Sequence, residues 1–523
     1  MGTIAGQILT GVLLTVAVLV AVAVGVALLA WTPLSDASLH EPRRTSRTRT
    51  RRIFHHAIRW ARQLLLTARQ RWASTGLGFP VSHVVRHPAR LVVVGFAGAV
   101  LLGTALLSLP WATESGHGPP VVTALFTSTS AVCVTGLVIE DTGTYWSLFG
   151  QIVILALIQI GGLGIMTLAS LLGLLVARRL RIRLQLGTQA ETKALGVGHV
   201  RRVVVGVLRI SLLMEAVVAV ALTWRFAVGY DIGLTRSTYL GIFHAISAFN
   251  NAGFGLYADS LVRFATDPLI CLPIAAAVII GGLGFPVLLE LRHELSHPRH
   301  WSLHTKITVG SSLVLLALGW VVFTLTEWSN DATLGPLSTP GKLLAGFTAA
   351  VMPRTAGFNS LDIAGMNDVT LAMTDMLMFV GGGSAGTAGG IKVTTFALLG
   401  FVVLAELRGE PSVHALGRKL PAGVQRQALT VVLLSITAVA VSTLALLALT
   451  PFGLDQVLFE VTSAFATVGL STGITAHIGT AGHAILIVLM FVGRLGPITA
   501  VTALALRERT RRYERPEERP LVG

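Results

Sequence analysis

Long apolar stretches recur along the chain, separated by shorter polar segments. They predict membrane-spanning helices, because about 20 helical residues cross a hydrocarbon core. The nine predicted spans are residues 4–31, 90–110, 147–177, 203–224, 267–291, 307–326, 371–404, 427–450 and 482–506. Two shorter amphipathic stretches, 121–131 and 454–466, cannot span and are predicted to enter the membrane and turn back. The pattern predicts an all-α polytopic membrane protein.

Two glycine patterns repeat with these helices. One is a loop with a single glycine, and the loops lie a little over one hundred residues apart: Val134-Thr135-Gly136, Asn251-Ala252-Gly253, Thr355-Ala356-Gly357 and Thr467-Val468-Gly469. The other is a glycine phrase in the following apolar stretch, beginning at Gly161, Gly281, Gly381 and Gly493. A fixed repeat period indicates one structural unit built several times. We predict four helix–pore-loop–helix repeats around one pseudo-four-fold ion pore: residues 90–180, 203–291, 307–404 and 427–506.

The residue types of the four loops suit a cation filter. Non-helical backbone at membrane depth is tolerated only where it lines a watery cavity or packs against protein. Inward-pointing carbonyl groups replace the water shell of a cation, and glycine reaches positive φ without strain. Hydroxyl groups of Thr135, Thr355 and Thr467 supply further oxygens. For one loop a simple tight turn explains the glycine equally well, but four in register favour a filter.

Composition and charge placement agree with a membrane protein. Hydrophobic residues make up 53% of the chain, charged residues 12%, and the mean hydropathy is +0.73. The net charge of +15 would suit nucleic acid, but most lysines and arginines fall in the segments 43–90, 178–202, 292–306, 408–426 and 507–519. This positive-inside bias predicts that those segments are cytoplasmic and that the glycine loops lie outside. We predict a multi-pass protein of the cell membrane that binds no nucleic acid.

The ends of the chain extend beyond the four repeats. Residues 1–89 are predicted to hold a retained transmembrane helix and an arginine-rich linker, and residues 507–523 a cytoplasmic tail. The run Arg43–Arg52 is expected to lie against anionic lipid headgroups. Cys133 and Cys271 fall in different repeats and give no disulfide framework.

A second feature predicts a gate beneath the loops. The stretch 371–404 would be about 51 Å long as one helix, against a core of about 30 Å. Its glycines make a continuous helix costly, so we predict a break by an intramembrane loop that acts as a movable plug; a packed kink is the alternative. The candidate gate residues are Gly381, Gly382, Gly383, Gly386, Gly389, Gly390, Lys392 and Arg494. Arg494 is interpreted as a charge barrier to cations, or else as an ion-pair partner of Asp375 or Glu215.

These motifs resemble the Trk/Ktr/HKT potassium transporters over residues 90–506. The segments Thr127–Leu137, Gly389–Phe396 and Phe459–Leu470 look most like the ion-conducting Ktr membrane subunit (KtrB/TrkH-like). Cys133 stands where threonine is more usual in the family, and the helix 4–31 extends the family's core. The resemblance implies potassium as the transported substrate, with Gly136 favouring potassium over sodium, and no organic cofactor.

The resemblance also implies partners. It predicts a homodimer on a cytoplasmic nucleotide-binding regulatory ring (KtrA/TrkA-like) supplied by a separate chain. The basic segments 178–202 and 408–426 are the expected contact surfaces.

Two other functions stay open at this point. A sodium- or proton-coupled cation symporter of the same fold would show the same motifs, and an ion-flux assay with each gradient separates the two. His293-Glu294-Leu295-Ser296-His297 matches a zinc-peptidase motif, which requires both histidines on one helical face. We expect no enzyme, because Pro298 follows directly and the motif lies outside the repeats.

Overall fold

The computed structural model describes residues 88–185 and 197–496 of the 523. The predicted first span 4–31, the run Arg43–Arg52 and the tail 507–523 lie outside the described residues. The chain forms two compact units, Met1–His87 with Ala194–Arg209, and Pro88–Lys193 with Ile210–Gly523. The described part of the first unit is the start of one helix, and the account below concerns the second unit.

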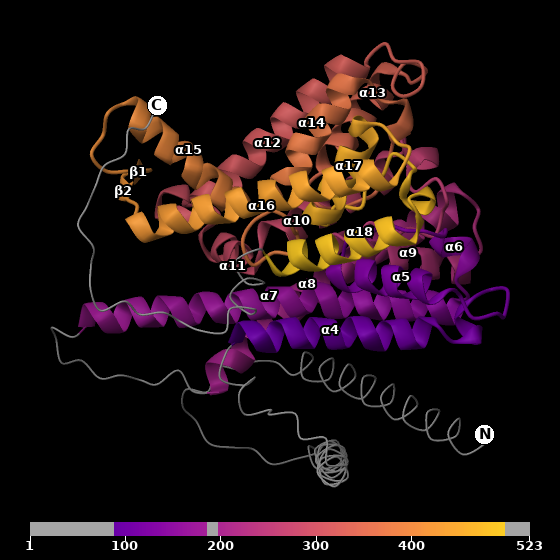
Figure 1. Cartoon of the computed structure of the whole chain (residues 1–523), viewed down its shortest axis with the longest axis horizontal. Coiled ribbons are helices and arrows are strands. Elements are labelled where there is room, and N and C mark those ends of the chain that lie inside the picture. Colours follow the sequence, from indigo (N-terminus) through magenta and orange to yellow (C-terminus); the bar gives the residue numbers. More distant parts are fainter. Residues whose placement is uncertain (1–87, 186–196, 497–523) are drawn as a thin grey trace, which may run out of the picture. The chain divides into compact units, whose positions relative to one another are not determined.

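The second unit is built almost wholly of helices (Figure 1). The helices that fall on predicted spans are α4 (Pro88–Leu107), α7 (Leu148–Gln185), α8 (Val197–Gly229, in this unit from residue 210 on), α10 (Pro268–Leu283), α11 (Phe285–Glu294), α12 (Leu303–Glu327), α14 (Asp368–Phe379), α15 (Val393–Leu407), α16 (Ala422–Leu449) and α18 (Gly479–Leu495). The short helices that precede the four glycine loops are α5 (Val121–Cys133), α9 (Leu234–Phe249), α13 (Thr339–Val351) and α17 (Leu454–Ala466), and α6 (Thr142–Tyr145) is a single turn. A two-stranded antiparallel hairpin, β1 (His414–Ala415) and β2 (Arg418–Lys419), joins α15 to α16.

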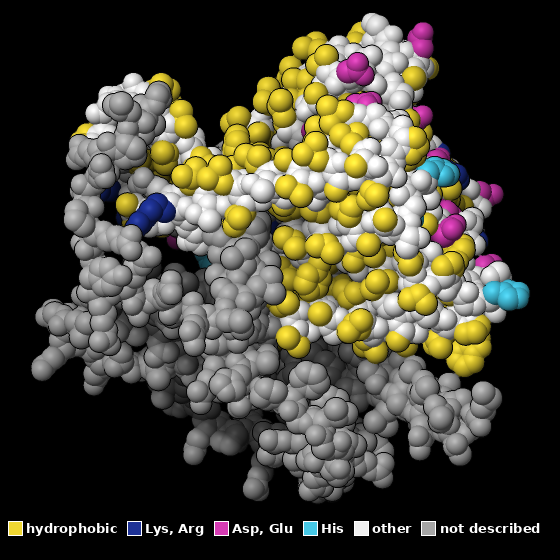
Figure 2. Space-filling model, viewed as in Figure 1, with side chains coloured by type: hydrophobic (Ala, Val, Ile, Leu, Met, Phe, Trp, Pro, Cys, Tyr) yellow, Lys and Arg dark blue, Asp and Glu magenta, His cyan; other side chains and the backbone are white. Residues whose placement is uncertain are grey.

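The helices present apolar side chains outward, as a lipid-facing protein must. Residues of α16 such as Leu433, Val441 and Leu444 are 55%, 60% and 67% exposed. Contiguous exposed apolar surface of this kind marks contact with a membrane or a partner. Figure 2 shows hydrophobic side chains spread over α16 and α18, whereas acidic side chains lie near α13 and along the edge toward α6, where histidines also appear. Among the described residues, four helices, within α7, α8, α12 and α16, are long and apolar enough to span a membrane, and the bent pair α10 and α11 would be a fifth if it forms one span.

Two predicted spans are not single helices. The break predicted within 371–404 is confirmed, since α14 ends at Phe379 and α15 begins at Val393. The span predicted over 267–291 is not one continuous helix, because α10 and α11 meet at a bend of 102°. The bend falls at Gly284, whose φ of 95° is open to glycine and strained for other residues. The third glycine of the second phrase therefore redirects the helix.

Each short helix packs in the same way. The helices α5, α9, α13 and α17 each contact another helix of their own repeat, namely α7, α10, α12 and α18. Each also contacts a helix of the preceding repeat that carries the glycine phrase or, for α14, ends just before it. These contacts are α9 on α7, α13 on α10, α17 on α14, and α5 on α18. The last of these contacts joins the first repeat to the fourth. The predicted half-length elements 121–131 and 454–466 correspond to α5 and α17.

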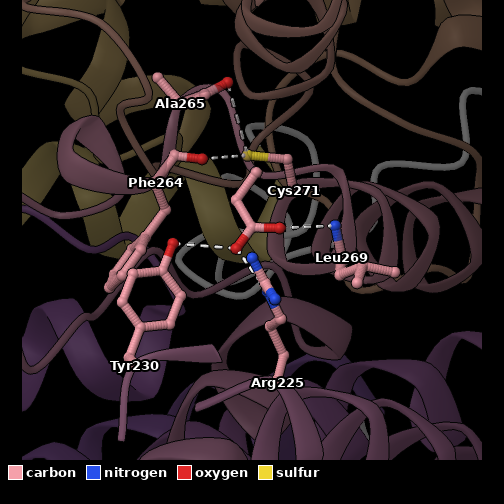
Figure 3. Close-up of polar contacts among 7 residues, drawn as sticks. Arg225, Tyr230, Phe264, Ala265, Leu269 and Cys271 are labelled. Atoms are coloured by element: carbon pink, nitrogen blue, oxygen red, sulfur yellow. Dashed lines mark hydrogen bonds and ion pairs between the residues drawn. The ribbon is translucent and has the colours of Figure 1, made fainter. Parts of the chain in front are cut away.

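A polar cluster joins α8 to the start of α10 (Figure 3). The buried carboxylate of Asp267 accepts hydrogen bonds from Arg225 Nε at 2.7 Å, Tyr230 Oη at 2.9 Å and the backbone N–H of Leu269 at 3.0 Å. The last of these caps the helix, whose first N–H groups have no partner within it. Asp267 therefore fixes the position at which α10 begins.

We expect Asp267→Ala to destabilise the protein clearly. Loss of an N-cap alone costs about 1 kcal/mol, and the substitution also leaves Arg225 and Tyr230 without their acceptor. The matched control is Asp259→Ala, which removes an ion pair with Arg263 whose two side chains are 50% and 35% exposed and which contributes little. Thermal unfolding in detergent measures both, and equal midpoints for the two variants would contradict this role of Asp267.

Candidate functional site

The four glycine loops lie against one another in a closed ring. A Cβ atom placed on Gly136 would lie 2.4 Å from the carbonyl oxygen of Ala252, and one on Gly253 would lie 2.8 Å from that of Ala356. A Cβ atom on Gly357 would likewise lie 2.4 Å from the Val468 carbonyl oxygen, and one on Gly469 would lie 2.1 Å from that of Thr135. The fourth loop therefore meets the first, and the ring is closed. No side chain larger than glycine fits at these four positions without movement of the neighbouring backbone.

The backbone of the loops departs from the usual helix ending. Just after α5, α9 and α17 the chain passes through a left-handed residue two positions before the loop glycine. These residues are Val134 (φ 56°), Asn251 (φ 59°) and Thr467 (φ 51°). The next N–H group bonds to a carbonyl five residues earlier at 2.8 Å in all three loops. Such endings ordinarily carry glycine, and a β-branched residue at positive φ is a genuine outlier. Strain of this kind clusters at functional sites, where the surrounding structure holds it in place.

Two serines support the ring. The Oγ atoms of Ser130 and Ser463 accept the N–H groups of Gly136 and Gly469, each at 3.1 Å. We assigned no role to these two serines from the sequence. They could have been recognised by their constant spacing, since each serine stands six residues before its loop glycine. They fix the orientation of the peptide group that precedes each glycine.

The three loop threonines are buried and keep unpaired hydroxyl groups. Thr135, Thr355 and Thr467 are fully buried, and their hydroxyl oxygens have no hydrogen-bond partner in the described part of the chain. Buried hydroxyls are normally satisfied by protein or water. Three orphaned hydroxyls in one ring are therefore available as ligands.

A cavity of about 270 Å³ opens at one side of the ring, and we call it the vestibule. All four loop glycines line it, together with polar side chains. Asp141 is the one charged residue among its described lining residues, so the vestibule carries a negative charge. The other polar lining side chains are Thr142, Tyr257, Ser260, Asn359, Ser471 and Thr475.

The glycine phrases allow helices to approach the ring. A Cβ atom on Gly161, Gly281 or Gly493 would lie 2.0, 2.0 or 1.7 Å from a carbonyl oxygen in the last turn of a short helix. Those oxygens belong to Val132, Phe249 and Phe465, each four residues before its loop glycine. The first glycine of the phrase is thus required by close helix packing. In the third repeat, Gly381 instead approaches the carbonyl oxygen of Gly389.

The segment between α14 and α15, residues 380–392, folds back on itself beneath the ring. Its ends pair, with Gly381 N–H donating to the Ile391 carbonyl at 2.9 Å. The N–H groups of Gly383 and Thr387 donate to carbonyls of Gly282 and Gly281 on α10, at 2.8 and 3.1 Å. We call residues 380–392 the glycine segment.

The glycine segment also touches two of the loops. Thr387 Oγ1 donates to Asn251 Oδ1 at 3.0 Å, in the second loop. A Cβ atom on Gly389 would lie 1.9 Å from Thr467 Oγ1, in the fourth loop. The predicted gate residues Gly382, Gly386 and Gly390 lie in the same segment. Contacts with opposite members of the ring place the segment across its underside.

Two basic side chains, the buried Arg494 and the partly buried Lys392, hold the glycine segment. Arg494 donates through Nη1 to the carbonyl oxygen of Thr387 and through Nη2 to that of Gly161 at 3.3 Å. Lys392 Nζ donates to the Ala388 carbonyl at 2.5 Å. Both side chains therefore donate to carbonyl groups of the glycine segment, and Arg494 also links the segment to Gly161 of α7.

The ion-pair interpretation of Arg494 is wrong. Within residues 88–185 and 197–496, no carboxylate lies within salt-bridge distance of Arg494. Glu215 instead accepts hydrogen bonds from Gln159 Nε2 at 3.0 and 3.1 Å and from Asn250 Nδ2 at 3.3 Å. One oxygen of Asp375 is buried without a partner in the same part of the chain.

The zinc-peptidase motif does not form its helical face. The helix α11 ends at Glu294, and His297 lies beyond it with a φ of −123°. His293 and His297 therefore do not share one face of a helix. The imidazoles of His297 and His300 stack on each other at the surface, near the carboxylate of Glu294.

Comparison with known proteins gives one consistent family. Residues 90–513 match the TrkH family, described as cation transport proteins. The chain is 40% identical over 430 residues to Ktr system potassium uptake protein B of Bacillus subtilis, covering 81% of this chain and 94% of that protein. It is 39% identical to the protein of the same name from Vibrio alginolyticus (83% and 94% covered), and 35% identical to potassium/sodium uptake protein NtpJ of Enterococcus hirae (83% and 97% covered).

The fold is also that of a solved transporter. The crystal structure of the potassium transporter TrkH from Vibrio parahaemolyticus superposes with a TM-score of 0.65 at 20% identity, covering 86% of this chain and 91% of that one. The match in fold is independent of the close sequence relatives. The chain is a multi-pass membrane protein and belongs to the Trk/Ktr family of cation transport proteins.

Proposed function

We propose that this protein takes up potassium through a channel-like path that crosses the ring of glycine loops. The observation that carries the proposal is the closed ring, in which the four loops meet and three buried threonine hydroxyls lack partners. Potassium is coordinated chiefly by loop carbonyls of Val134, Thr135, Gly136 and their counterparts in the other loops. The names of the 40% and 39% identical relatives support potassium as the cargo.

The glycine segment serves as the gate in this proposal. It lies across the underside of the ring and is held by Arg494 and Lys392. A cation that leaves the ring meets this segment and two positive charges. Movement of the segment opens the path, and the backbone contacts of Arg494 oppose that movement.

The vestibule faces outside, and the basic segments lie in the cytoplasm of a cell-membrane protein. Each of the four repeats, 90–180, 203–291, 307–404 and 427–506, contributes one loop to the pore. We further propose a homodimer bound to a separate cytoplasmic nucleotide-binding ring, which acts on the glycine segment. The resemblance to the Ktr membrane subunit supports this assembly.

Reconstitution tests the proposed function directly. The purified protein in liposomes is expected to take up ⁸⁶Rb⁺ or potassium down a potassium gradient, without a sodium or proton gradient. Uptake that requires either gradient would favour the coupled symporter. Equal uptake of sodium and potassium would assign a broader selectivity, as in the relative named for both ions. No uptake of either ion would contradict the proposal.

Shortening the glycine segment tests its role as the gate. Deletion of residues 384–387 removes the tip that contacts α10 and the second loop, while the pairing at Gly381 and Ile391 stays. We expect potassium flux per inserted protein to rise severalfold and to depend less on the cytoplasmic partner. Unchanged or lower flux in a well-folded deletion variant would mean that the segment is a passive kink.

A further inference from the structure

We propose a second cation site in the vestibule, formed by the hydroxyl oxygens of Ser471 and Thr475 with the buried carboxylate of Glu460 behind them. The site would hold a monovalent cation that keeps part of its water. It rests on the proposed function, since it would load the ring from the vestibule side.

Glu460 is a buried acid without a basic partner. It lies in α17, nine residues before Gly469, and is fully inaccessible to solvent. Its carboxylate accepts hydrogen bonds from Ser471 Oγ at 2.8 Å and from Thr475 Oγ1. No lysine, arginine or histidine pairs with it in the part of the chain that the structure describes. Buried charges are ordinarily paired with a counter-ion, so this arrangement requires an explanation.

Both hydroxyls bond to the carboxylate, and both residues line the vestibule. A serine or threonine hydroxyl has one hydrogen and two lone pairs. With both hydrogens on Glu460, the two hydroxyl oxygens, which lie 3.0 Å apart, keep their lone pairs for other donors or for a cation. The N–H group of Gly473 donates to one lone pair of Ser471 Oγ, at 2.9 Å. The remaining lone pairs belong to residues that line the vestibule beside the four loop glycines.

The site belongs to the fourth repeat alone. The residues nine before the other loop glycines are Thr127, His244 and Thr348, so the described repeats place a carboxylate at this position once. The residues two after those glycines are Val138, Gly255 and Asn359, and none carries a hydroxyl. Packing of the repeats therefore does not require Glu460 or Ser471. The asymmetry points to a local function at one side of the vestibule.

The surroundings suit a partly hydrated cation. The vestibule of about 270 Å³ has room for several waters, each of which takes about 30 Å³ of liquid volume. His483 Nε2 lies 2.7 Å from the Thr475 carbonyl oxygen and holds this stretch of backbone against α18. A cleft with negative charge behind polar walls raises the local concentration of cations. The site would thus raise the affinity for uptake without contacting the gate.

Uptake kinetics of Glu460→Gln test the site. Glutamine keeps the shape and an acceptor but removes the charge. We expect the apparent KM for external potassium to rise about three- to tenfold, as loss of one nearby charge screened by water predicts. The maximal rate per inserted protein should stay close to the wild-type value. Ser471→Ala, which removes an oxygen and leaves the acid, should raise KM in the same direction.

Glu327→Gln is the matched control. Glu327 is also a fully buried acid without a basic partner in the described chain. Its carboxylate accepts from Asn330, Thr333, Asn367 and Thr370, and none of these lines the vestibule. We expect this variant to lower thermal stability and abundance and to leave KM unchanged.

The outcomes separate the second site from the proposed function. A wild-type KM in both Glu460→Gln and Ser471→Ala would overturn the second site. It would also be overturned if these variants lost only abundance, as expected for Glu327→Gln, and kept the wild-type KM. If Glu460→Gln fails to insert, Ser471→Ala decides the question. Absence of potassium uptake by the wild-type protein would instead contradict the proposed function.

Discussion

Gly136→Ser is expected to reduce the preference for potassium over sodium at least tenfold. The Cβ atom would lie 2.4 Å from the Ala252 carbonyl oxygen and 3.1 Å from the Cα atom of Gly253, so the first and second loops must move apart. The φ of 91° adds backbone strain for any residue but glycine. Overpacking of this kind costs about 1–3 kcal/mol, and about 1.4 kcal/mol corresponds to a factor of ten in the balance between two ions.

Reversal potentials in mixed potassium and sodium gradients measure this effect. Gly98→Ser is the control, because a Cβ atom on Gly98 meets no atom within 4 Å. The control should keep the wild-type reversal potential. An unchanged reversal potential in Gly136→Ser would show that the ring does not select between the ions.

Arg494→Ala is expected to raise maximal potassium uptake about tenfold or more. The substitution removes a buried positive charge from beneath the ring and releases the carbonyls of Thr387 and Gly161. Both changes lower the barrier to a cation, and a decrease of about 1.4 kcal/mol is tenfold in rate. The apparent affinity for potassium should stay nearly constant, because the ring itself is unchanged.

The variant Arg494→Lys separates the effect of the positive charge from the effect of the hydrogen bonds that hold the glycine segment. Lysine keeps the positive charge, but its ammonium group cannot reproduce the planar fork that joins two carbonyls. Uptake by the lysine variant should therefore lie between the wild-type and alanine values, measured per inserted protein. Reduced uptake by a well-inserted alanine variant would contradict both proposed roles of Arg494, as a charge barrier to cations and as a restraint on the glycine segment.

The glycine loops and the break in the stretch 371–404 were predictable because their signals are local and recur. Glycine at a loop and a glycine phrase in the next helix stand at the same places in each repeat, and glycine density predicted the break before Val393. The sequence also led to the loop threonines, since hydroxyl groups beside a loop glycine are visible in one segment. These are features that a single stretch of chain carries by itself.

Contacts between repeats were not predictable from one sequence. The bend at Gly284 depends on the glycine segment, whose Ala385 carbonyl accepts the Phe285 N–H group at 3.2 Å. Arg494 suggested a barrier or an ion pair, whereas its partners are carbonyls more than one hundred residues away in the chain. Left-handed Val134 and Thr467 run against local preference, so only the folded ring reveals them.

Diffraction with thallium, which substitutes for potassium, tests the central claim most directly. Crystals of the wild-type protein grown with Tl⁺ are expected to give their strongest anomalous peak inside the ring formed by Gly136, Gly253, Gly357 and Gly469. Thallium uptake by the same preparation in liposomes would show that the protein is active. A ring without anomalous density in a protein that transports Tl⁺ would place the ion path elsewhere and contradict the account.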